Sequence, residues 1–210
     1  MSLVRSQADA PPMDSPSSLL SFIRTKKSSQ KPLLVGIDGP GGTGKTTLAL
    51  HLQVLDPTIT IVHMDDFDLP SNGKSMGDPL VKEIGADTDW QRLLREVVMP
   101  VREGKVASYR PFDREGGRMG REKSVAPQGT VIIEGVFSLR KELFSSIDVG
   151  IFLICSLQTR LERALKRDGL EMRGRWENDW IPMEERYMAE HKPQVYAHKV
   201  VDTEKALVML

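Results

Sequence analysis

The residues from Gly39 to Thr46 have the types and the spacing that hold a phosphate chain. Their sequence, GPGGTGKT, fits the pattern G-x-x-x-x-G-K-[S/T] throughout. Glycines let backbone N–H groups converge on phosphate oxygens, because a Cβ would obstruct both the turn and the ligand. In this pattern Lys45 reaches the β- and γ-phosphates, and the Thr46 hydroxyl binds Mg²⁺. The motif therefore predicts a nucleoside triphosphate site made of Gly39, Pro40, Gly41, Gly42, Thr43, Gly44, Lys45, Thr46 and Thr47.

A second pattern overlaps the first. Gly39, Gly41 and Gly44 also satisfy G-x-G-x-x-G, and Asp65 and Asp66 follow about twenty residues later, as in dinucleotide-binding folds. The alternatives are thus an NAD-binding oxidoreductase or a glycine turn without a ligand. The lysine and threonine after the third glycine favour a triphosphate, because a pyrophosphate site has no use for a cation or a Mg²⁺ ligand there.

Three carboxylates follow apolar runs. Phosphoryl transfer to a hydroxyl needs a carboxylate that accepts the proton, and Asp65, at the end of the run 59–64, is the predicted base. Capping of the next turn is the alternative. Asp66 is interpreted as a turn residue or an outer partner of Mg²⁺. Glu134 follows the run TVII, where a carboxylate is costly without a cation, so Mg²⁺ is its predicted partner, directly or through water. A solvent-facing strand end is the alternative.

Arginines are concentrated in one helical segment. Arg160, Arg163 and Arg167 fall at i, i+3 and i+7, which places three like charges on one helix face. A polyphosphate would relieve their repulsion. With Arg173 and Arg175 close behind, the segment is predicted to be a lid that brings guanidinium groups to the transferred phosphoryl group. A solvated helix face, eased by neighbouring carboxylates, is the alternative.

The elements that position these residues alternate between strands and helices. Apolar runs predict strands over 33–37, 59–64, 130–133, 149–155 and 199–201. Helical patterns begin after a cap at Ser17 or Ser18, at Lys45, after Asp87 or Asp89, and near residues 157 and 176. This alternation predicts an α/β fold with a parallel sheet covered by helices on both faces. Ligands bind at the carboxyl edge of such a sheet, where the phosphate loop lies.

Proline, glycine and polar residues mark the predicted boundaries. Residues 1–16 are interpreted as a disordered leader, and residues 17–210 as a single domain with its lid near 160–178. Residues 69–86 are expected to form a loop that covers the substrate. Pro100 and Gly104 are expected to end the helix over 90–101, and Tyr109 to Arg121 is expected to be a surface loop.

The composition restricts the class of protein. Lys plus Arg and Asp plus Glu number 29 each, so the chain has no global field for nucleic acid or an anionic membrane. One cysteine, Cys155, fits a reducing compartment and is expected to be a buried packing residue. The apolar runs are too short to cross a bilayer, and we expect a cytoplasmic protein. The four histidines lack metal-ligand spacing. Homo-oligomer formation is left open.

Taken together, these segments resemble the uridine kinase and phosphoribulokinase group of P-loop kinases, which includes pantothenate kinases. The resemblance covers most of residues 33–202 and lies in GIDGPGGTGKTT, HMDDF, VIIEGVFSL, TRLERALKRD and the terminal VVD. It implies a three-layer P-loop NTPase fold with a five-stranded parallel sheet, ATP and Mg²⁺ as cofactors, and a small-molecule acceptor with a hydroxyl group.

The resemblance also implies roles for individual residues. Lys45, Asp65, Arg163 and Arg167 would act in catalysis, Arg163 would also contact ATP, and Thr46 and Glu134 would hold the metal. The acceptor would contact Asp65, Phe67, Asp87, Arg110, Phe112 and Glu134. The chain departs from the nucleoside-phosphorylating members at Asp68, where they have an aromatic residue, and its Asp87-Thr88-Asp89 resembles their ribose-binding segment only loosely.

We therefore expect an ATP-dependent kinase with a nucleoside as the leading acceptor. A pantothenate-like molecule and a sugar phosphate are the alternatives within this class, and the choice between ATP and GTP is open. A regulatory nucleotide-binding protein is an alternative of another class, although the chain lacks the N-K-x-D motif that reads a guanine base. The NAD-binding oxidoreductase stays as the third alternative, and a catalytically silent binding module as the fourth.

Overall fold

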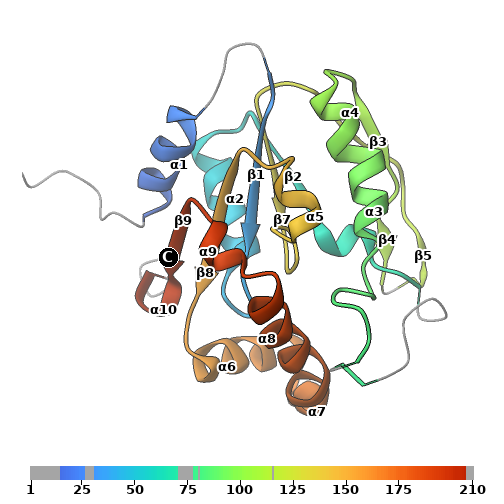
Figure 1. Cartoon of the computed structure of the whole chain (residues 1–210), viewed down its shortest axis with the longest axis vertical. Coiled ribbons are helices and arrows are strands. Elements are labelled where there is room, and N and C mark those ends of the chain that lie inside the picture. Colours follow the sequence, from blue (N-terminus) through green and yellow to red (C-terminus); the bar gives the residue numbers. More distant parts are fainter. Residues whose placement is uncertain (1–14, 27–30, 71–77, 80, 115, 207–210) are drawn as a thin grey trace, which may run out of the picture.

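A parallel sheet of five strands forms the centre of the molecule (Figure 1). The computed structural model describes residues 15–26, 31–70, 78–79, 81–114 and 116–206. The strand order is β2-β7-β1-β8-β9, which confirms the predicted five-stranded parallel sheet. The strands are β1 (Leu33–Asp38), β2 (Ile59–His63), β7 (Thr130–Glu134), β8 (Val149–Ile154) and β9 (Lys199–Asp202).

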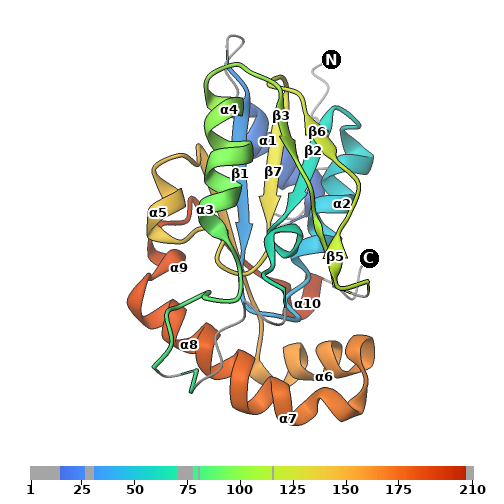
Figure 2. The ribbon, with the colours of Figure 1, turned by 90° about the vertical axis from the view of Figure 1, so that its right-hand side faces the viewer.

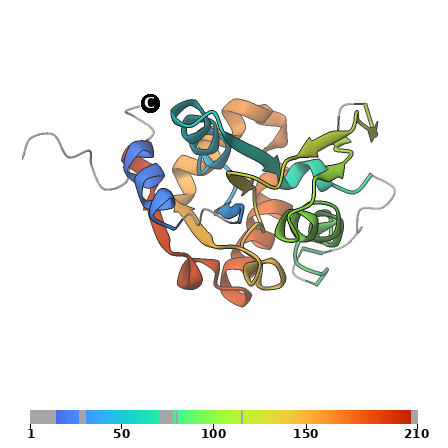
Figure 3. The same ribbon diagram turned by 90° about the horizontal axis from the view of Figure 1, so that it is seen from above.

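Helices cover both faces of this sheet, so the fold has three layers (Figure 3). Successive side chains of a strand point to opposite faces. Leu33, Val35 and Ile37 of β1 accordingly pack in one core with α1 (Pro16–Thr25) and α2 (Lys45–Leu55), while Leu34 packs in the core of the other face. Both cores are apolar and buried, and β1 lies between them in the middle of the sheet.

The first helix begins earlier than predicted. The expected cap at Ser17 or Ser18 is wrong, because Ser15 caps α1 and accepts a hydrogen bond from the Ser18 backbone N–H at 3.2 Å. Pro16, which the sequence assigned to the leader, is the first helical residue, where its missing N–H costs nothing and its fixed φ suits the helix. The rest of the predicted leader, residues 1–14, lies outside the described residues.

The second face is covered by one continuous helical stretch. It consists of α3 (Trp90–Leu93), the π-helical turn η3 (Leu94–Val98) and α4 (Met99–Arg102), with Asp89 as its cap. Pro100 lies inside the helix, so the expectation that it ends the helix is wrong, whereas Gly104, the other predicted end, lies two residues after the last helical residue, Arg102. The π-helical turn ends at Val98, two residues before this proline, whose missing N–H interrupts the α-helical hydrogen-bond ladder, and the helix continues to Arg102. The short α5 (Lys141–Phe144) packs on the same face.

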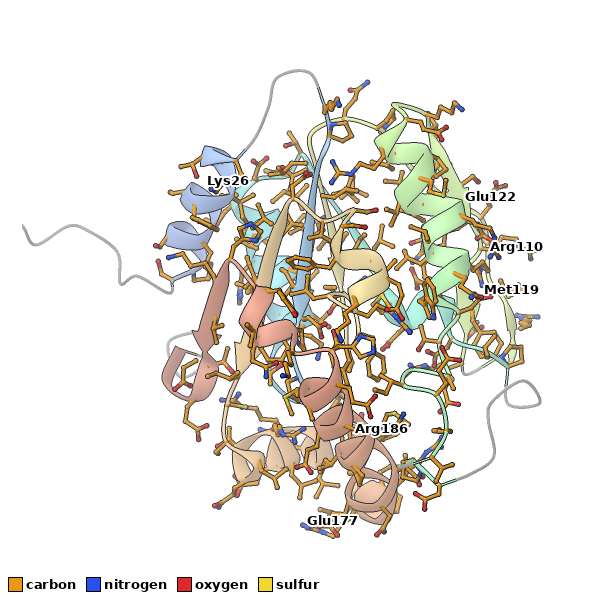
Figure 4. All side chains as sticks on the ribbon, viewed as in Figure 1. Lys26, Arg110, Met119, Glu122, Glu177 and Arg186 are labelled. Atoms are coloured by element: carbon orange, nitrogen blue, oxygen red, sulfur yellow. The ribbon has the colours of Figure 1, made fainter. Side chains whose placement is uncertain are left out.

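The predicted surface loop from Tyr109 to Arg121 contains strands. The pair β3 (Ala107–Tyr109) and β6 (Lys123–Val125) and the pair β4 (Phe112–Asp113) and β5 (Arg118–Met119) are antiparallel. Figure 4 labels Arg110, Met119 and Glu122 on this outer flank of the molecule. The strands are too short for a period-2 pattern to reveal them.

The carboxyl edge of the sheet is closed by a C-terminal helical layer (Figure 2). It consists of α6 (Leu157–Asp168), η4 (Leu170–Met172), α7 (Arg173–Arg175), the π-helical turn η5 (Trp176–Trp180) and α8 (Ile181–Glu190). Leu161, Ala164, Leu165 and Trp176 pack together there, whereas Leu157, the first residue of α6, is exposed. Two short helices, α9 (Pro193–Tyr196) and α10 (Thr203–Ala206), flank β9.

The predicted substrate-covering loop is described only in part, since residues 71–77 and 80 lie outside the described residues. The described residues near its C-terminal end are joined to α8. The Arg186 guanidinium, labelled in Figure 4, donates hydrogen bonds to the backbone oxygens of Lys82 at 2.6 Å and Pro79 at 3.2 Å. In the part of the chain that the structure describes, every helix is too short or too polar to span a membrane.

Candidate active site

The phosphate loop connects β1 to α2 in a conformation that only glycine adopts readily. Gly44 caps α2 with φ +90°, in the left-handed region. Gly39 has φ +144°, and a Cβ at this position would lie 2.4 Å from the Leu153 backbone oxygen. The loop amides and the N-terminus of α2 form a cradle for an anion. The predicted strand, glycine turn and helix are confirmed.

Lys45 is buried and lies across this loop. Its Nζ donates hydrogen bonds to the backbone oxygens of Gly39 at 2.8 Å and Pro40 at 3.0 Å. The Thr43 hydroxyl also donates to the Pro40 oxygen, at 2.7 Å. The ammonium group is thus already held over the cradle, where a phosphate oxygen can replace a carbonyl as its acceptor.

Thr46 and Glu134, the two predicted metal ligands, meet beside the loop. The Thr46 hydroxyl donates to Glu134 Oε1 at 3.0 Å, although 88 positions separate the two residues. Glu134 is buried at the end of β7. The pair fits Mg²⁺, which prefers oxygen ligands and binds through one or two carboxylates together with substrate phosphates and water. Within the described residues, no group of three or more His, Cys, Asp or Glu could hold a metal ion.

His63 is a neighbour that sequence reasoning missed. Its Nδ1 lies 2.5 Å from Glu134 Oε1, and the hydrogen bond with this carboxylate raises the pKa of His63. The strand register explains the contact, because His63 of β2 is paired with Glu134 of β7. Both residues lie at the end of a predicted apolar strand, and this shared position was the signal that could have placed His63 beside Glu134.

Asp65 lies in η2 (Met64–Phe67), directly after β2. Its side chain is 70% exposed, and Oδ1 is 3.2 Å from Arg114 Nη2. The same guanidinium is 2.7 Å from Asp68 Oδ2, so Arg114 bridges the two carboxylates. Asp66 points elsewhere and accepts hydrogen bonds from Tyr109 and Lys123. Of the two adjacent aspartates, Asp65 is therefore the accessible one.

The predicted acceptor contacts fall into two groups. Phe67, the last residue of η2, is fully buried and stacks on Tyr109 with ring centroids 4.9 Å apart, so it anchors η2 to the core. Phe112 is also buried. Asp87 and Arg110 reach polar groups. Asp87 Oδ2 is 2.8 Å from Lys82 Nζ, while its buried Oδ1 has no hydrogen-bond partner in the described part of the chain. Arg110 donates to backbone oxygens of its own hairpin.

The arginines of α6 have separate partners and do not converge on one acceptor. Arg160 is buried beside Glu184, and Arg163 donates to the Thr203 backbone oxygen at 3.2 Å and contacts the Cys155 sulfur. Arg167 pairs with Asp168 at 2.6 Å. This hydrogen bond raises the pKa of Arg167, and the charge of Asp65 makes a smaller contribution in the same direction.

Cys155 is only partly buried, so the expectation of a buried packing residue is wrong. It follows the last residue of β8 and precedes α6, beyond the core of the sheet. Partial burial still raises the pKa of its thiol.

Asp38 is a second residue that sequence reasoning missed. It is fully buried at the end of β1 and accepts hydrogen bonds from the backbone N–H groups of Gly39 at 2.6 Å, Leu139 at 2.8 Å and Phe137 at 3.2 Å. The Tyr187 hydroxyl donates to it at 2.6 Å, and burial raises the pKa of both groups. Asp38 thereby joins the phosphate loop to the segment after β7 and to α8.

Comparison with curated proteins identifies relatives below 30% identity. The chain is 28% identical over 140 residues to the inorganic pyrophosphatase TTM2 of Arabidopsis thaliana, which covers 65% of this chain and 20% of that protein. It is 28% identical over 172 residues to a uridine kinase of Schizosaccharomyces pombe, covering 78% and 37%. A uridine kinase of Lactiplantibacillus plantarum is 25% identical over 191 residues, covering 86% of each chain. The chain thus spans well under half the length of the first two of these relatives. No family model matches it.

Solved structures share the fold. The structure of a possible uridine kinase from Bacillus stearothermophilus superposes with a TM-score of 0.71 at 22% identity, covering 89% of this chain and 97% of that one. A D-glycerate 3-kinase from Cryptococcus neoformans gives a TM-score of 0.55 at 15% identity, covering 90% and 93%. These likenesses confirm the three-layer P-loop fold.

Proposed function

We propose that this chain, a uridine kinase-like P-loop kinase by its fold and its sequence relatives, transfers the terminal phosphoryl group of ATP to a hydroxyl of a small molecule. The observation that carries this proposal is the contact between the Thr46 hydroxyl and the Glu134 carboxylate beside the phosphate loop. An NAD site has no use for such a pair of Mg²⁺ ligands at this position.

The phosphate loop supplies the binding of the donor. Backbone N–H groups of the loop and the N-terminus of α2 hold the phosphates, and Lys45 Nζ turns from the Gly39 and Pro40 oxygens to a phosphate oxygen. Thr46 and Glu134 would hold Mg²⁺, which would neutralise charge on the phosphates.

Asp65 is the proposed base. It accepts the proton of the acceptor hydroxyl as that oxygen forms a bond to the γ-phosphorus, while the bond from phosphorus to the bridging oxygen breaks and ADP leaves. Its exposure leaves it open to an acceptor, and Arg114 Nη2, 3.2 Å from Oδ1, orients the carboxylate. Arg167 of α6 is the proposed cation that shares the charge of the transferred group.

A nucleoside is the leading acceptor. Asp87 supports a hydroxylated acceptor, because its side chain is 28% exposed and its Oδ1 has no hydrogen-bond partner in the described part of the chain. Asp68 reduces the support for uridine, since it is buried and paired with Arg114 where nucleoside kinases of this group have an aromatic residue. A sugar phosphate is the second candidate, because the relatives include a phosphoribulokinase of Synechocystis.

The test is a screen for Mg²⁺-dependent consumption of ATP and GTP with uridine, cytidine, pantothenate and sugar phosphates as acceptors. We expect turnover with one acceptor class, abolished by Lys45→Ala and reduced about 10²–10⁴-fold by Asp65→Asn. Asp66→Asn is the matched control, because Asp66 is paired with Lys123 and Tyr109, and it should keep near-parental turnover. If Asp65→Asn has the parental rate, Asp65 is not the base. If the protein binds no Mg²⁺–nucleoside triphosphate, the kinase proposal fails.

A further inference from the structure

Glu184 of α8 reaches the phosphate loop from the C-terminal helical layer. Its Oε1 accepts a hydrogen bond from the Gly41 backbone N–H at 2.8 Å, and its Oε2 lies 2.5 Å from Arg160 Nη1 of α6. One carboxylate therefore joins three segments, namely the phosphate loop, α6 and α8. Gly41 and Arg160 belong to predicted segments, but Glu184, which connects them, was not predicted as a site residue.

The Glu184–Arg160 pair is buried on both sides. The side chains are 6% and 5% exposed, so both charges lie away from water. Burial raises the pKa of Glu184, while the charges of Lys45 and Arg160 oppose the shift. A buried ion pair with additional hydrogen bonds is strongly destabilised when one partner is removed, because the other charge is left uncompensated. The pair is thus a fixed part of the fold.

The loop glycines match the surfaces that these two helical segments present. A Cβ at Gly42 would lie 2.2 Å from the Arg160 backbone oxygen, and a Cβ at Gly41 would lie 2.4 Å from the Trp176 ring. Both obstacles belong to the C-terminal layer. The tip of the loop therefore packs directly against α6 and η5, in addition to the hydrogen bond from Gly41 to Glu184.

We propose that the Glu184–Arg160 pair fixes the tip of the phosphate loop in its phosphate-binding conformation, which makes Glu184 a positioning residue for the nucleotide. The inference rests on the proposed function, because it assigns the pair to the donor site of that reaction. A loop amide that is held by a buried carboxylate loses its conformational freedom before the ligand arrives, and the cost of ordering the loop is removed from binding. A displacement of about 1 Å in such a site can lower the reaction rate about 10²-fold.

The position of the pair gives a distinctive kinetic expectation. Glu184 touches the donor loop and none of the predicted acceptor residues among the described contacts. Loss of the pair should thus raise KM for ATP and leave KM for the acceptor unchanged. A merely structural role would lower the amount of folded protein without this selectivity.

The experiment measures binding of Mg²⁺ with a non-hydrolysable ATP analogue by calorimetry and unfolding by urea, for the full chain and four variants. Glu184→Ala should raise Kd about 10- to 100-fold, the loss typical when a residue that orients the binding groups is removed. Glu184→Gln keeps an oxygen for the Gly41 N–H and should lose less affinity. Arg160→Met combined with Glu184→Leu removes both charges, so it should recover stability relative to Glu184→Ala, but not affinity. Glu185→Gln is the control, because Glu185 is exposed and its Oε1 contacts the same arginine more weakly, at 4.0 Å from Arg160 Nη2.

The outcomes separate the two proposals. If the parent chain does not bind the Mg²⁺–ATP analogue, the proposed function fails. If the parent binds and Glu184→Ala binds equally well, the positioning role is refuted. Tighter binding by Glu184→Ala would show that the carboxylate competes with the nucleotide, and recovery of affinity in the double variant would show that only stability was affected. Either result overturns the inference.

Discussion

Replacement of Gly42 by alanine tests the contact between the phosphate loop and α6. Gly42 has φ +80°, where an alanine costs about 1–2 kcal/mol. The new Cβ would also lie 2.2 Å from the Arg160 oxygen and 2.8 Å from its carbonyl carbon, which are backbone atoms that cannot rotate away. Overpacking of this kind costs about 1–3 kcal/mol. We therefore expect Gly42→Ala to lower the free energy of unfolding by about 2–5 kcal/mol.

Gly104 provides a matched control for the backbone strain. Its φ is +73°, but a Cβ at this position would meet nothing within 4 Å. Gly104→Ala should consequently lower the free energy of unfolding only by the backbone strain, about 1–2 kcal/mol. The difference in the free energy of unfolding between the two variants, about 1–3 kcal/mol, measures the packing of α6 on the loop alone.

Thermal and urea unfolding of both variants give the comparison. For a chain of this length, 1 kcal/mol corresponds to about 2–4 °C in Tm, so Gly42→Ala should melt about 2–12 °C below Gly104→Ala. Binding of the Mg²⁺–ATP analogue should weaken in Gly42→Ala and stay at the parental value in Gly104→Ala. Equal melting temperatures of the two variants would refute the packing of α6 against the loop.

Three further substitutions probe other parts of the site. Tyr187→Phe removes the hydroxyl donor of the buried Asp38 and should lower the free energy of unfolding by about 1–3 kcal/mol in urea titrations; no change would contradict the hydrogen bond. Asp168→Asn should destabilise the chain only at higher pH: the hydrogen bond with its arginine neighbour lowers the pKa of Asp168 in the folded state below 3.8, so its contribution is present above this value and is lost as the pH falls through the folded-state pKa. Urea unfolding of parent and variant from pH 2 to 7, followed by tryptophan fluorescence, measures this, and a constant difference would contradict the assignment. Thr46→Val should raise the Mg²⁺ concentration for half-maximal nucleotide binding at least about tenfold, since even outer partners of a metal contribute that much; an unchanged Mg²⁺ requirement would remove Thr46 from the metal site.

The parts of the fold that the sequence predicts are those with a local periodic signal. The apolar run before Gly39 and the helical pattern from Lys45 identify the strand, the loop and the helix, because each pattern repeats within a few residues. The two- and three-residue strands around Arg110 and Met119 have no such repeat, and their glycines and arginines are typical of loops. Pro100 also led to a wrong helix end, because the preceding π-helical turn accommodates this proline inside the helix.

The side-chain contacts of the site divide in the same way. Thr46 and Glu134 were each predicted from a motif, and the carboxyl edge of a parallel sheet brings them together; their role at the metal stays a prediction. The contact of Asp38 with Tyr187 joins residues 149 positions apart, and nothing near either residue indicates the other. Such pairs depend on how α8 is laid across the sheet, which periodicity does not determine.

The partners of Asp38 have a consequence for the order in which the chain becomes functional. During synthesis, the glycine-rich motif leaves the ribosome long before Leu139 and Tyr187 do. The nascent chain therefore carries the complete motif without the donors that fix the end of β1, and contacts of such long sequence separation form slowly because a large loop must close first. Nucleotide binding should accordingly emerge late in translation, only when α8 has docked.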